Sequence, residues 1–226
     1  MGLMAPSEHD EPSADGDAGA EERPRHFSLV RTFALADLIT LANAACGMGA
    51  ILCCLGYVAA GERALLWTAL ALFPLALIAD VCDGAVARWR RRHSPYGADL
   101  DRLADVVSFG VAPAVLGYSL GLRGGFDIAA LIYFVACGIS RLARFNVTAA
   151  ALTTSEGKVS HFEGTPIPTS LVLVGVWAVA FGLDAVHGAI WGGSWQVGGW
   201  TFHPLSCMYL ASGSAMVSAS LRIPKP

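Results

Sequence analysis

Long apolar runs limit what this chain can fold into more than any other feature of its sequence. They lie near residues 36–59, 64–91, 97–121, 126–148, 166–187 and 200–221, with turn-forming stretches between them. Each run is long enough to cross roughly 30 Å of hydrocarbon at about 1.5 Å per residue. Only 15% of the residues are charged, whereas a soluble domain usually has about 25%. The sequence therefore predicts an all-α, polytopic membrane protein with six transmembrane helices.

The N-terminal region has a different character. Residues 1–27 are rich in Asp, Glu, Ala, Pro and Gly and show no apolar period, which is typical of a disordered tail. They lack the basic segment followed by an apolar segment that marks a signal peptide. Residues 27–38 can form an amphipathic helix lying on the membrane surface. We therefore expect a cytoplasmic tail over residues 1–27 and a single transmembrane domain over residues 28–226.

The distribution of Lys and Arg predicts the orientation of the spans. If both termini lie on one side of the membrane, 13 of the 15 basic residues lie on that side, and only Arg63 and Arg123 lie on the other. Because the basic side of a membrane protein is usually cytoplasmic, we expect a multi-pass protein of the cytoplasmic membrane with both termini in the cytoplasm. Trp191, Trp195 and Trp200 suit the outer interface. The net charge of −3 gives no reason to expect a nucleic-acid partner.

Four aspartates interrupt the apolar pattern at the expected cytoplasmic ends of the second and third runs. At about 100° per residue, Asp80 and Asp83 lie on one face of a helix, and Asp101 and Asp105 lie on one face of the next. Asp99 points to the opposite side of that second helix. The short turn between the two runs predicts antiparallel neighbours. The four carboxylates are therefore expected to converge at the cytoplasmic side.

Four carboxylates held close together repel one another unless they are protonated or neutralised by cations. A cluster of carboxylate oxygens without His or Cys favours Mg²⁺, Mn²⁺ or Ca²⁺, and a pair of such ions suits phosphoryl transfer. Gly84 and Ala87 share the acidic face and leave room for a ligand, and Arg88 offers a fork suited to phosphate. Acids at helix ends can also be solvated or paired with arginine, but four of them on two converging faces favour a metal site.

The spacing of these residues resembles a known signature. The chain reads Asp-x-x-Asp-Gly-x-x-Ala-Arg from Asp80 to Arg88, then eight residues, then Gly-x-x-x-Asp-x-x-x-Asp from Gly97 to Asp105. Every fixed position matches the signature of the CDP-alcohol phosphotransferases. The six-span layout with a leading surface helix is also similar to that family, so the resemblance covers about residues 30–222.

The resemblance implies a role for each position of the signature. Asp80 and Asp101 would bridge two metal ions, Mg²⁺ or Mn²⁺. Asp83 would bind one of them, and Asp105 would bind the other and act as the general base. The donor, CDP-diacylglycerol, would be contacted by residues of the signature and of the segment TLANAACG in the first span, namely Thr40, Asn43, Gly84, Ala87, Arg88 and Gly97. Asn43 could instead form a hydrogen bond between helices.

Other segments resemble the branch of this family whose acceptor is L-serine, in its membrane-embedded bacterial and archaeal form. These segments are LADVVSFGVAPA, RLARFNV, HFEGTPIP and MVSASLRIPKP. The expected reaction transfers the phosphatidyl group to the serine hydroxyl and releases CMP. Arg141 or Arg144 could bind the serine carboxylate, and Asn146 its ammonium group, although the arginines could also reach lipid headgroups. The resemblance further implies a homodimer surrounded by membrane lipids.

Three alternatives remain open. A sister enzyme would use another acceptor, such as glycerol 3-phosphate, inositol phosphate or a different amino alcohol. A cation transporter would use the carboxylates as an ion path, but such paths usually pass through the membrane midplane, and Asp127 and Asp184 stand alone in the sequence. A scaffold without activity would have no need for all four aspartates.

Overall fold

Helices make up most of the part of the chain that the structure describes. The computed structural model describes residues 35–90, 95–152, 161–163, 165–218 and 222–224, all within one unit, Phe33–Pro226. The α-helices are α2 (Leu35–Ala60), α3 (Arg63–Arg90), α4 (Pro95–Asp105), α5 (Ala112–Ser119), α6 (Gly125–Leu152), α7 (Leu171–Gly182) and α8 (Cys207–Val217).

Shorter elements connect or extend these helices. A π-helical segment, η1 (Val106–Val111), lies between α4 and α5, and the described residues also form the 3₁₀ turns η2 (Ile167–Ser170), η3 (His187–Ala189) and η4 (Pro204–Ser206). The strands are β1 (His161–Glu163), β2 (Trp195–Val197), β3 (Trp200–Phe202) and β4 (Arg222–Pro224). They form two antiparallel pairs, β1 with β4 and β2 with β3.

The predicted helical class is confirmed, while the number of membrane crossings stays a prediction. Among the described residues, three helices are long and apolar enough to cross a membrane, over Asp37–Ala60, Arg63–Val86 and Gly125–Arg144. A shorter apolar helix spans Ile167–Gly182. Helical segments also lie in the other predicted ranges, but they are shorter or divided. The predicted tail and almost all of the surface helix lie outside the described residues.

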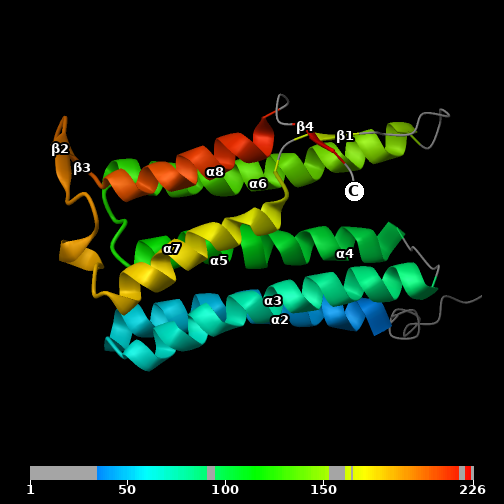
Figure 1. The fold of residues 1–226 in the computed structure, drawn as a ribbon, viewed down its shortest axis with the longest axis horizontal. Helices are drawn as coiled ribbons and strands as arrows, with labels where there is room; N and C mark the ends of the chain where they lie inside the picture. Colours follow the sequence, from blue (N-terminus) through cyan, green and yellow to red (C-terminus); the bar gives the residue numbers. More distant parts are fainter. Residues whose placement is uncertain (1–34, 91–94, 153–160, 164, 219–221, 225–226) are drawn as a thin grey trace, which may run out of the picture. The chain divides into compact units, whose positions relative to one another are not determined.

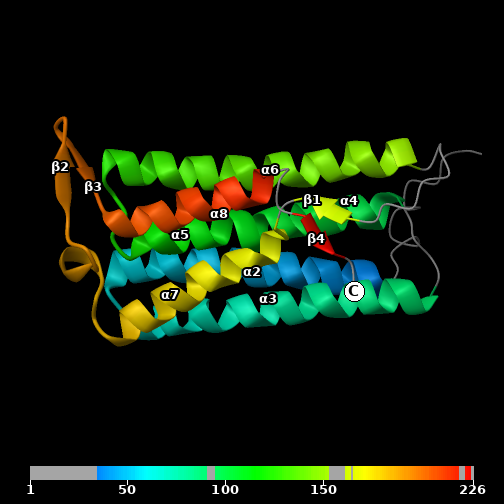
Figure 2. The ribbon, with the colours of Figure 1, turned by 45° about the horizontal axis from the view of Figure 1, so that its top comes forward.

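The long helices run side by side within this unit (Figures 1 and 2). α2 and α3 form a hairpin whose turn contains Gly61 with a φ of +71°, a backbone conformation that suits glycine because it has no Cβ. The Gly61 N–H donates to the Tyr57 carbonyl at 2.8 Å and closes the last turn of α2. α2 also packs against α4, η1 and α5, and α6 packs against α8. α2 is therefore the common partner of the two helices that carry the aspartates.

A buried chain of hydrogen bonds joins three helices in the apolar core. The Trp177 indole on α7 donates to the Tyr209 hydroxyl on α8 at 2.9 Å, and that hydroxyl donates to the Pro113 carbonyl on α5 at 2.8 Å. A side chain at Gly117 would place its Cβ 2.5 Å from the Tyr209 hydroxyl oxygen, so the helices approach this closely only because residue 117 is glycine. Within hydrocarbon such satisfied polar pairs hold helices together without exposing a polar group to lipid.

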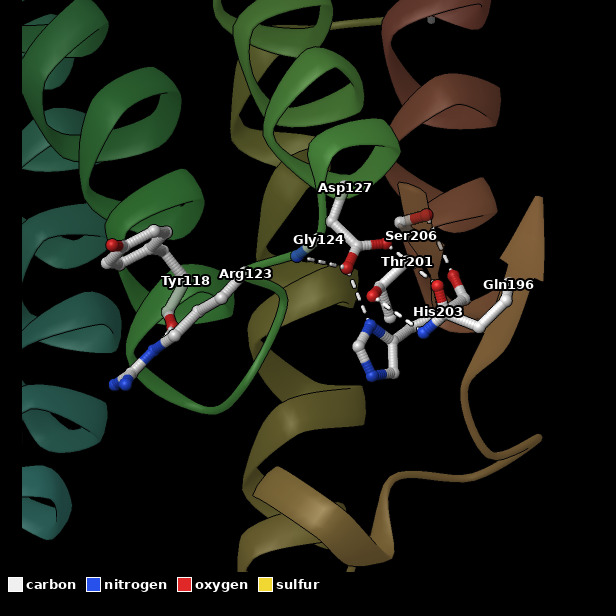
Figure 3. Close-up of polar contacts among 8 residues, drawn as sticks. All are labelled: Tyr118, Arg123, Gly124, Asp127, Gln196, Thr201, His203 and Ser206. Carbon is white, nitrogen blue, oxygen red and sulfur yellow. Dashed lines mark hydrogen bonds and ion pairs between the residues drawn. The ribbon is translucent and has the colours of Figure 1, made fainter. Parts of the chain in front are cut away.

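The end of the bundle opposite to α4 is closed by a polar cluster around Asp127 (Figure 3). Asp127 is fully buried in the first turn of α6. Its carboxylate accepts hydrogen bonds from the Gly124 N–H at 2.9 Å, the His203 N–H at 2.9 Å and His203 Nδ1 at 2.6 Å. A Cβ at Gly124 would lie 2.0 Å from the Thr201 carbonyl oxygen, so the chain packs tightly here. Asp127 thus caps α6 and ties it to the segment between β3 and η4.

Candidate metal centre

Three of the four aspartates bring oxygen atoms together near one end of the helix bundle. Asp80 comes from the second half of α3, and Asp101 and Asp105 come from α4. One carboxylate oxygen from each of the three lies within 4.8 Å of the others. Three of the four carboxylates that were predicted to converge therefore lie together. α2 packs against both α3 and α4 and holds them together.

The oxygen atoms of this cluster fit a divalent cation. Asp101 Oδ1 is buried and has no hydrogen-bond partner among the residues that the structure describes. A buried carboxylate oxygen without a partner is costly, and neighbouring carboxylates add repulsion. A cation removes both costs at once. Because the set contains only oxygen, it suits a hard ion such as Mg²⁺, Mn²⁺ or Ca²⁺.

Asp83 lies beside this group and has a partner of its own. Its side chain is 5% exposed, and its Oδ2 accepts a hydrogen bond from the Thr40 hydroxyl on α2 at 2.6 Å. Its charge is close enough to act on both Asp80 and Asp101. Asp83 is therefore placed to extend the cluster of three to a fourth carboxylate.

Asp99 provides an internal comparison on α4. Its side chain is 66% exposed and pairs with Arg102 of the same helix at 2.7 Å. It points away from the cluster, as its position on the helix predicts. The helical period thus separates an ordinary surface acid from the two acids that α4 turns inward.

The two polar residues of the first span bind carboxylates. Thr40 is 4% exposed and Asn43 is fully buried. Thr40 donates to Asp83, and the Asn43 side-chain amide donates to Asp105 Oδ1 at 3.3 Å. Sequence reasoning made both residues candidate contacts of the donor substrate, with a hydrogen bond between helices as the alternative for Asn43. The Asn43–Asp105 bond is such a contact, whereas Asp83 as the partner of Thr40 was not foreseen. Their spacing of three on a helix was the available signal, because it places both side chains on one face.

Arg141 and Arg144 of α6 have different surroundings. The Arg141 side chain is partly buried, its Nε has no hydrogen-bond partner among the described residues, and its charge is close enough to Asp105 for the two to attract. Arg144 is exposed. The structure therefore places one of the two predicted serine-binding arginines within electrostatic range of Asp105. The side chain of Asn146 lies outside the described residues.

The other predicted donor contacts are described only in part. Gly84 on α3 and Gly97 on α4 are both partly exposed, so neither is closed off by packing. Ala87 and Arg88 lie within α3, but their side chains are outside the described residues. Their proposed contacts with the donor stay predictions.

Comparison with known proteins identifies the family. The family model described as CDP-alcohol phosphatidyltransferase matches residues 33–204. The chain is 42% identical over 207 residues to a protein of Saccharomyces cerevisiae named CDP-diacylglycerol–serine O-phosphatidyltransferase, covering 89% of this chain and 74% of that protein. A Methanocaldococcus jannaschii protein of the same name is 36% identical over 150 residues, covering 66% of this chain and 63% of that protein.

An archaeal relative carries a related name. The archaetidylserine synthase of Methanothermobacter thermautotrophicus is 40% identical over 145 residues, which cover 62% of this chain and 56% of that protein. The match thus spans less than two thirds of each archaeal relative. The family match includes α2, α3 and α4 and all four aspartates, so this chain belongs to the CDP-alcohol phosphatidyltransferase family.

Proposed function

We propose that this chain is a CDP-diacylglycerol–serine O-phosphatidyltransferase. It transfers the phosphatidyl group of CDP-diacylglycerol to the hydroxyl of L-serine and produces phosphatidylserine and CMP. Family membership supports the reaction class, and the names of the yeast and Methanocaldococcus relatives support serine as the acceptor. We also infer from family membership that the chain works as a homodimer with its carboxylates facing the cytoplasm.

The convergence of Asp80, Asp101 and Asp105 carries this proposal. Their oxygen atoms lie within 4.8 Å of one another, and Asp83 lies beside them. Bound there, Mg²⁺ or Mn²⁺ would offset the charge of the donor pyrophosphate and stabilise the charge that develops during transfer. Asp80 and Asp101 would be ligands of both cations. Asp83 would be a ligand of one cation, and Asp105 of the other.

Asp105 is the proposed general base. It accepts the proton of the serine hydroxyl as the serine oxygen attacks the phosphorus that bears diacylglycerol. The bond from that phosphorus to the bridging oxygen of the pyrophosphate breaks, and CMP leaves with that oxygen. A carboxylate is a weak base for an alcohol, so correct alignment of Asp105 matters for the rate.

Arg141 is the proposed partner of the serine carboxylate. Its guanidinium lies near Asp105, and its Nε has no partner among the described residues. An arginine can bind a carboxylate through two parallel hydrogen bonds. Serine held in this way would bring its hydroxyl close to the base. Arg144 is exposed and is better suited to lipid headgroups.

A cation transporter fits the structure less well. The aspartates on the other side of the protein, which a continuous ion path would use, are engaged in structural contacts. Asp127 binds Gly124 and His203, and Asp184 pairs with Arg63. The carboxylate cluster therefore has no visible continuation within the described part of the chain.

The proposal is tested by measuring CMP release from CDP-diacylglycerol by the purified protein in detergent. Reactions contain serine, glycerol 3-phosphate, inositol phosphate or no acceptor, each with Mg²⁺, Mn²⁺ or EDTA. Asp105→Asn is compared with Asp99→Asn, which removes an acid of the same helix that points away from the cluster. We expect release that requires serine and metal, disappears in Asp105→Asn and persists in Asp99→Asn.

Each other result changes a specific part of the proposal. Release driven by a different alcohol would keep the metal centre and exclude serine as the acceptor. Folded protein that releases no CMP with any acceptor would contradict the enzymatic function. Equal activity of Asp105→Asn and wild type would remove Asp105 from the chemistry.

A further inference from the structure

A π-helical segment begins directly after the proposed general base. η1 covers Val106–Val111, and the Ala112 N–H donates to the Val107 carbonyl five residues earlier. π-helical turns are rare and occur frequently at functional sites. In this segment Ser108 is fully buried. Ser108 and Asp105 are three residues apart, so their side chains lie on the same buried face of the helical stretch.

Ser108 is bonded to another helix. Its hydroxyl donates to the main-chain carbonyl of Asn43 on α2 at 2.9 Å. The contact is close, because a Cβ at Gly47 would lie 2.4 Å from Ser108 Oγ and 2.7 Å from Ser108 Cα. Only glycine at position 47 permits α2 and η1 to approach to this distance. The hydrogen bond and the glycine together set the position of Asn43 relative to η1.

The side chain of the same Asn43 reaches back to Asp105. Its Nδ2 donates to Asp105 Oδ1 at 3.3 Å. An ionised carboxylate only accepts hydrogen bonds, so the amide nitrogen must face it. Two hydrogen bonds thus link Ser108 to Asp105 through Asn43. Ser108 binds the main-chain carbonyl of Asn43, and the side chain of Asn43 binds Asp105. Asp105 and Ser108 lie three residues apart on one continuous helical stretch.

We propose that Ser108 is a positioning residue for Asp105, acting through Asn43. The inference rests on the proposed function, in which Asp105 is the base and a cation ligand. By binding Oδ1, the Asn43 amide restricts rotation of the Asp105 carboxylate. Asp105 Oδ2 is then held in one orientation, free to accept the serine proton. The bond from Ser108 prevents Asn43 from shifting along or away from η1. The main role of the Asn43 side chain is therefore to orient Asp105. This role explains why Asn43 is buried without any contact to the donor substrate.

Alignment of this kind has a characteristic kinetic effect. A misplacement of about 1 Å at a reacting group can lower the rate roughly 100-fold. Removing the Ser108 hydroxyl weakens the alignment without removing a substrate contact. We therefore expect Ser108→Ala to lower kcat by roughly 10- to 100-fold, with the KM values for CDP-diacylglycerol and serine nearly unchanged.

The experiment is a double-mutant cycle on the purified protein in detergent. It compares wild type, Ser108→Ala, Asn43→Ala and the double variant, with kcat and both KM values measured for each. Ser119→Ala is the control, because Ser119 is another fully buried serine of the same helical stretch and lies about 16 Å from Ser108 by helical rise. Thermal unfolding of every variant checks that the comparison is made on folded protein.

The cycle distinguishes positioning from other roles. If Ser108 acts through Asn43, the double variant is no slower than Asn43→Ala alone, because the side chain to be positioned is already absent. Independent, multiplicative losses of kcat would overturn the proposal. A raised KM for CDP-diacylglycerol with unchanged kcat in Asn43→Ala would also overturn it and make Asn43 a donor contact.

A second readout separates this inference from the proposed function. Mn²⁺ affinity, measured by electron paramagnetic resonance on the same proteins, reports on Asp105 without any turnover. We expect weaker Mn²⁺ binding in Ser108→Ala and Asn43→Ala, no further loss in the double variant, and no change in Ser119→Ala. If wild type releases no CMP but shows this coupling, the proposed function fails and the positioning role stands. Wild-type Mn²⁺ affinity in Ser108→Ala, with unchanged kcat, contradicts the positioning role alone.

Discussion

At the scale of single residues, three of the five buried side-chain atoms without a hydrogen-bond partner in the described part of the chain belong to residues around Asp105, and the other two are Ser119 Oγ and Ser170 Oγ. Asn43 Oδ1, Asp101 Oδ1 and Arg141 Nε are buried and have no hydrogen-bond partner within the described part of the chain. Each costs about 1–3 kcal/mol if it stays unsatisfied. The three atoms come from α2, α4 and α6, and each residue contacts Asp105 or lies within range of its charge. For Asp101 Oδ1 a bound cation would supply the missing partner, and for Arg141 Nε the serine carboxylate would do so.

Replacement of Asp101 by asparagine tests the cation at this scale. Asp101→Asn removes one of the repelling charges, so we expect its thermal unfolding midpoint in EDTA to equal or exceed that of wild type. Mn²⁺ should raise the midpoint of wild type but not that of the variant, because a ligand at about 100 times its Kd stabilises a protein by about 2.7 kcal/mol. Differential scanning fluorimetry in detergent measures both effects. Equal stabilisation of the two proteins by Mn²⁺ would exclude Asp101 as a ligand.

The pH dependence of stability is expected to include a contribution from His187. This residue lies in η3, beyond the end of α7, and its Nε2 is 3.0 Å from the Tyr57 hydroxyl oxygen. Burial lowers the pKa of His187 below its usual value, and the Arg123 charge lowers this pKa further. The unfolded chain therefore binds the proton first, at about pH 6.5. The stabilisation is complete above that pH and is lost as the pH falls through the lowered pKa.

Thermal unfolding between pH 5 and pH 7.5 measures this contribution. We expect the midpoint of wild type to fall more steeply with acidification than that of His187→Gln, which cannot be protonated in this range. The difference between the two curves isolates His187 from the other titrating groups. Parallel curves would show that protonation of His187 does not oppose folding.

At the scale of elements, close contacts between helices depend on individual glycines. Gly47 of α2 lies against the backbone of η1, where a Cβ would be 2.7 Å from Ser108 Cα. Gly175 of α7 is different, because a Cβ there would have no neighbour within 4 Å. The same substitution therefore has opposite consequences on the two helices.

Gly47→Ala is expected to destabilise the protein and to lower its activity. Backbone atoms cannot move aside as a flexible side chain can, so α2 and η1 must separate, at a cost of about 1–3 kcal/mol. Gly175→Ala should be neutral or stabilising by up to about 1 kcal/mol, because alanine favours a helix. Thermal unfolding and CMP release of both variants test this contrast. Normal stability of Gly47→Ala would show that the two elements are not in tight contact.

The polar cluster at the other end of the bundle is expected to affect stability alone. Asp127→Asn keeps one acceptor oxygen but removes the negative charge and the second acceptor oxygen. The Gly124 N–H and the two His203 donors (Figure 3) then compete for one oxygen, which lowers the free energy of unfolding by about 1–3 kcal/mol. Asp184→Asn is the matched control, since the side chain of Asp184 is 74% exposed in its pair with Arg63 and such pairs contribute about 1 kcal/mol or less. We expect a lower unfolding midpoint only for Asp127→Asn, with kcat unchanged in both. A lower kcat in stable Asp127→Asn would link this end to catalysis.

At the scale of the whole molecule, the two ends of the bundle differ in chemistry. The end with α4 carries the carboxylates, and the opposite end carries the β2–β3 hairpin with exposed Trp195 and Trp200 (Figure 1). Exposed aromatic side chains are common where a membrane protein meets the interface with water. This polarity agrees with the proposed orientation, in which the carboxylates face the cytoplasm.

Cysteine labelling tests the orientation. Gln196→Cys in the hairpin and Asp99→Cys on α4 are introduced separately after the six native cysteines are replaced. We expect a membrane-impermeant maleimide to label the hairpin in intact cells and to label position 99 only after the membrane is opened. The reverse labelling pattern would show that the protein has the opposite orientation in the membrane. Labelling of both positions from outside would show that the two ends lie on the same side.

The sequence alone determined the features that depend on local periodicity. Hydrophobic runs predicted the helices, and the spacing of Asp80, Asp83, Asp101 and Asp105 predicted their faces, because the angle between residues on a helix is nearly constant. The outward direction of Asp99 follows from the same rule. The signature built on these positions was sufficient to recognise the family.

Only the tertiary structure decided which distant residues meet. Nothing in the sequence near Asn43 indicates that it binds Asp105, 62 positions away, or that Asp127 binds His203, 76 positions away. These contacts depend on how closely helices pack, which is set by glycines such as Gly47 and by the π-helical turn after Asp105. The helical period determines the face on which a side chain lies, whereas packing between helices determines what it touches.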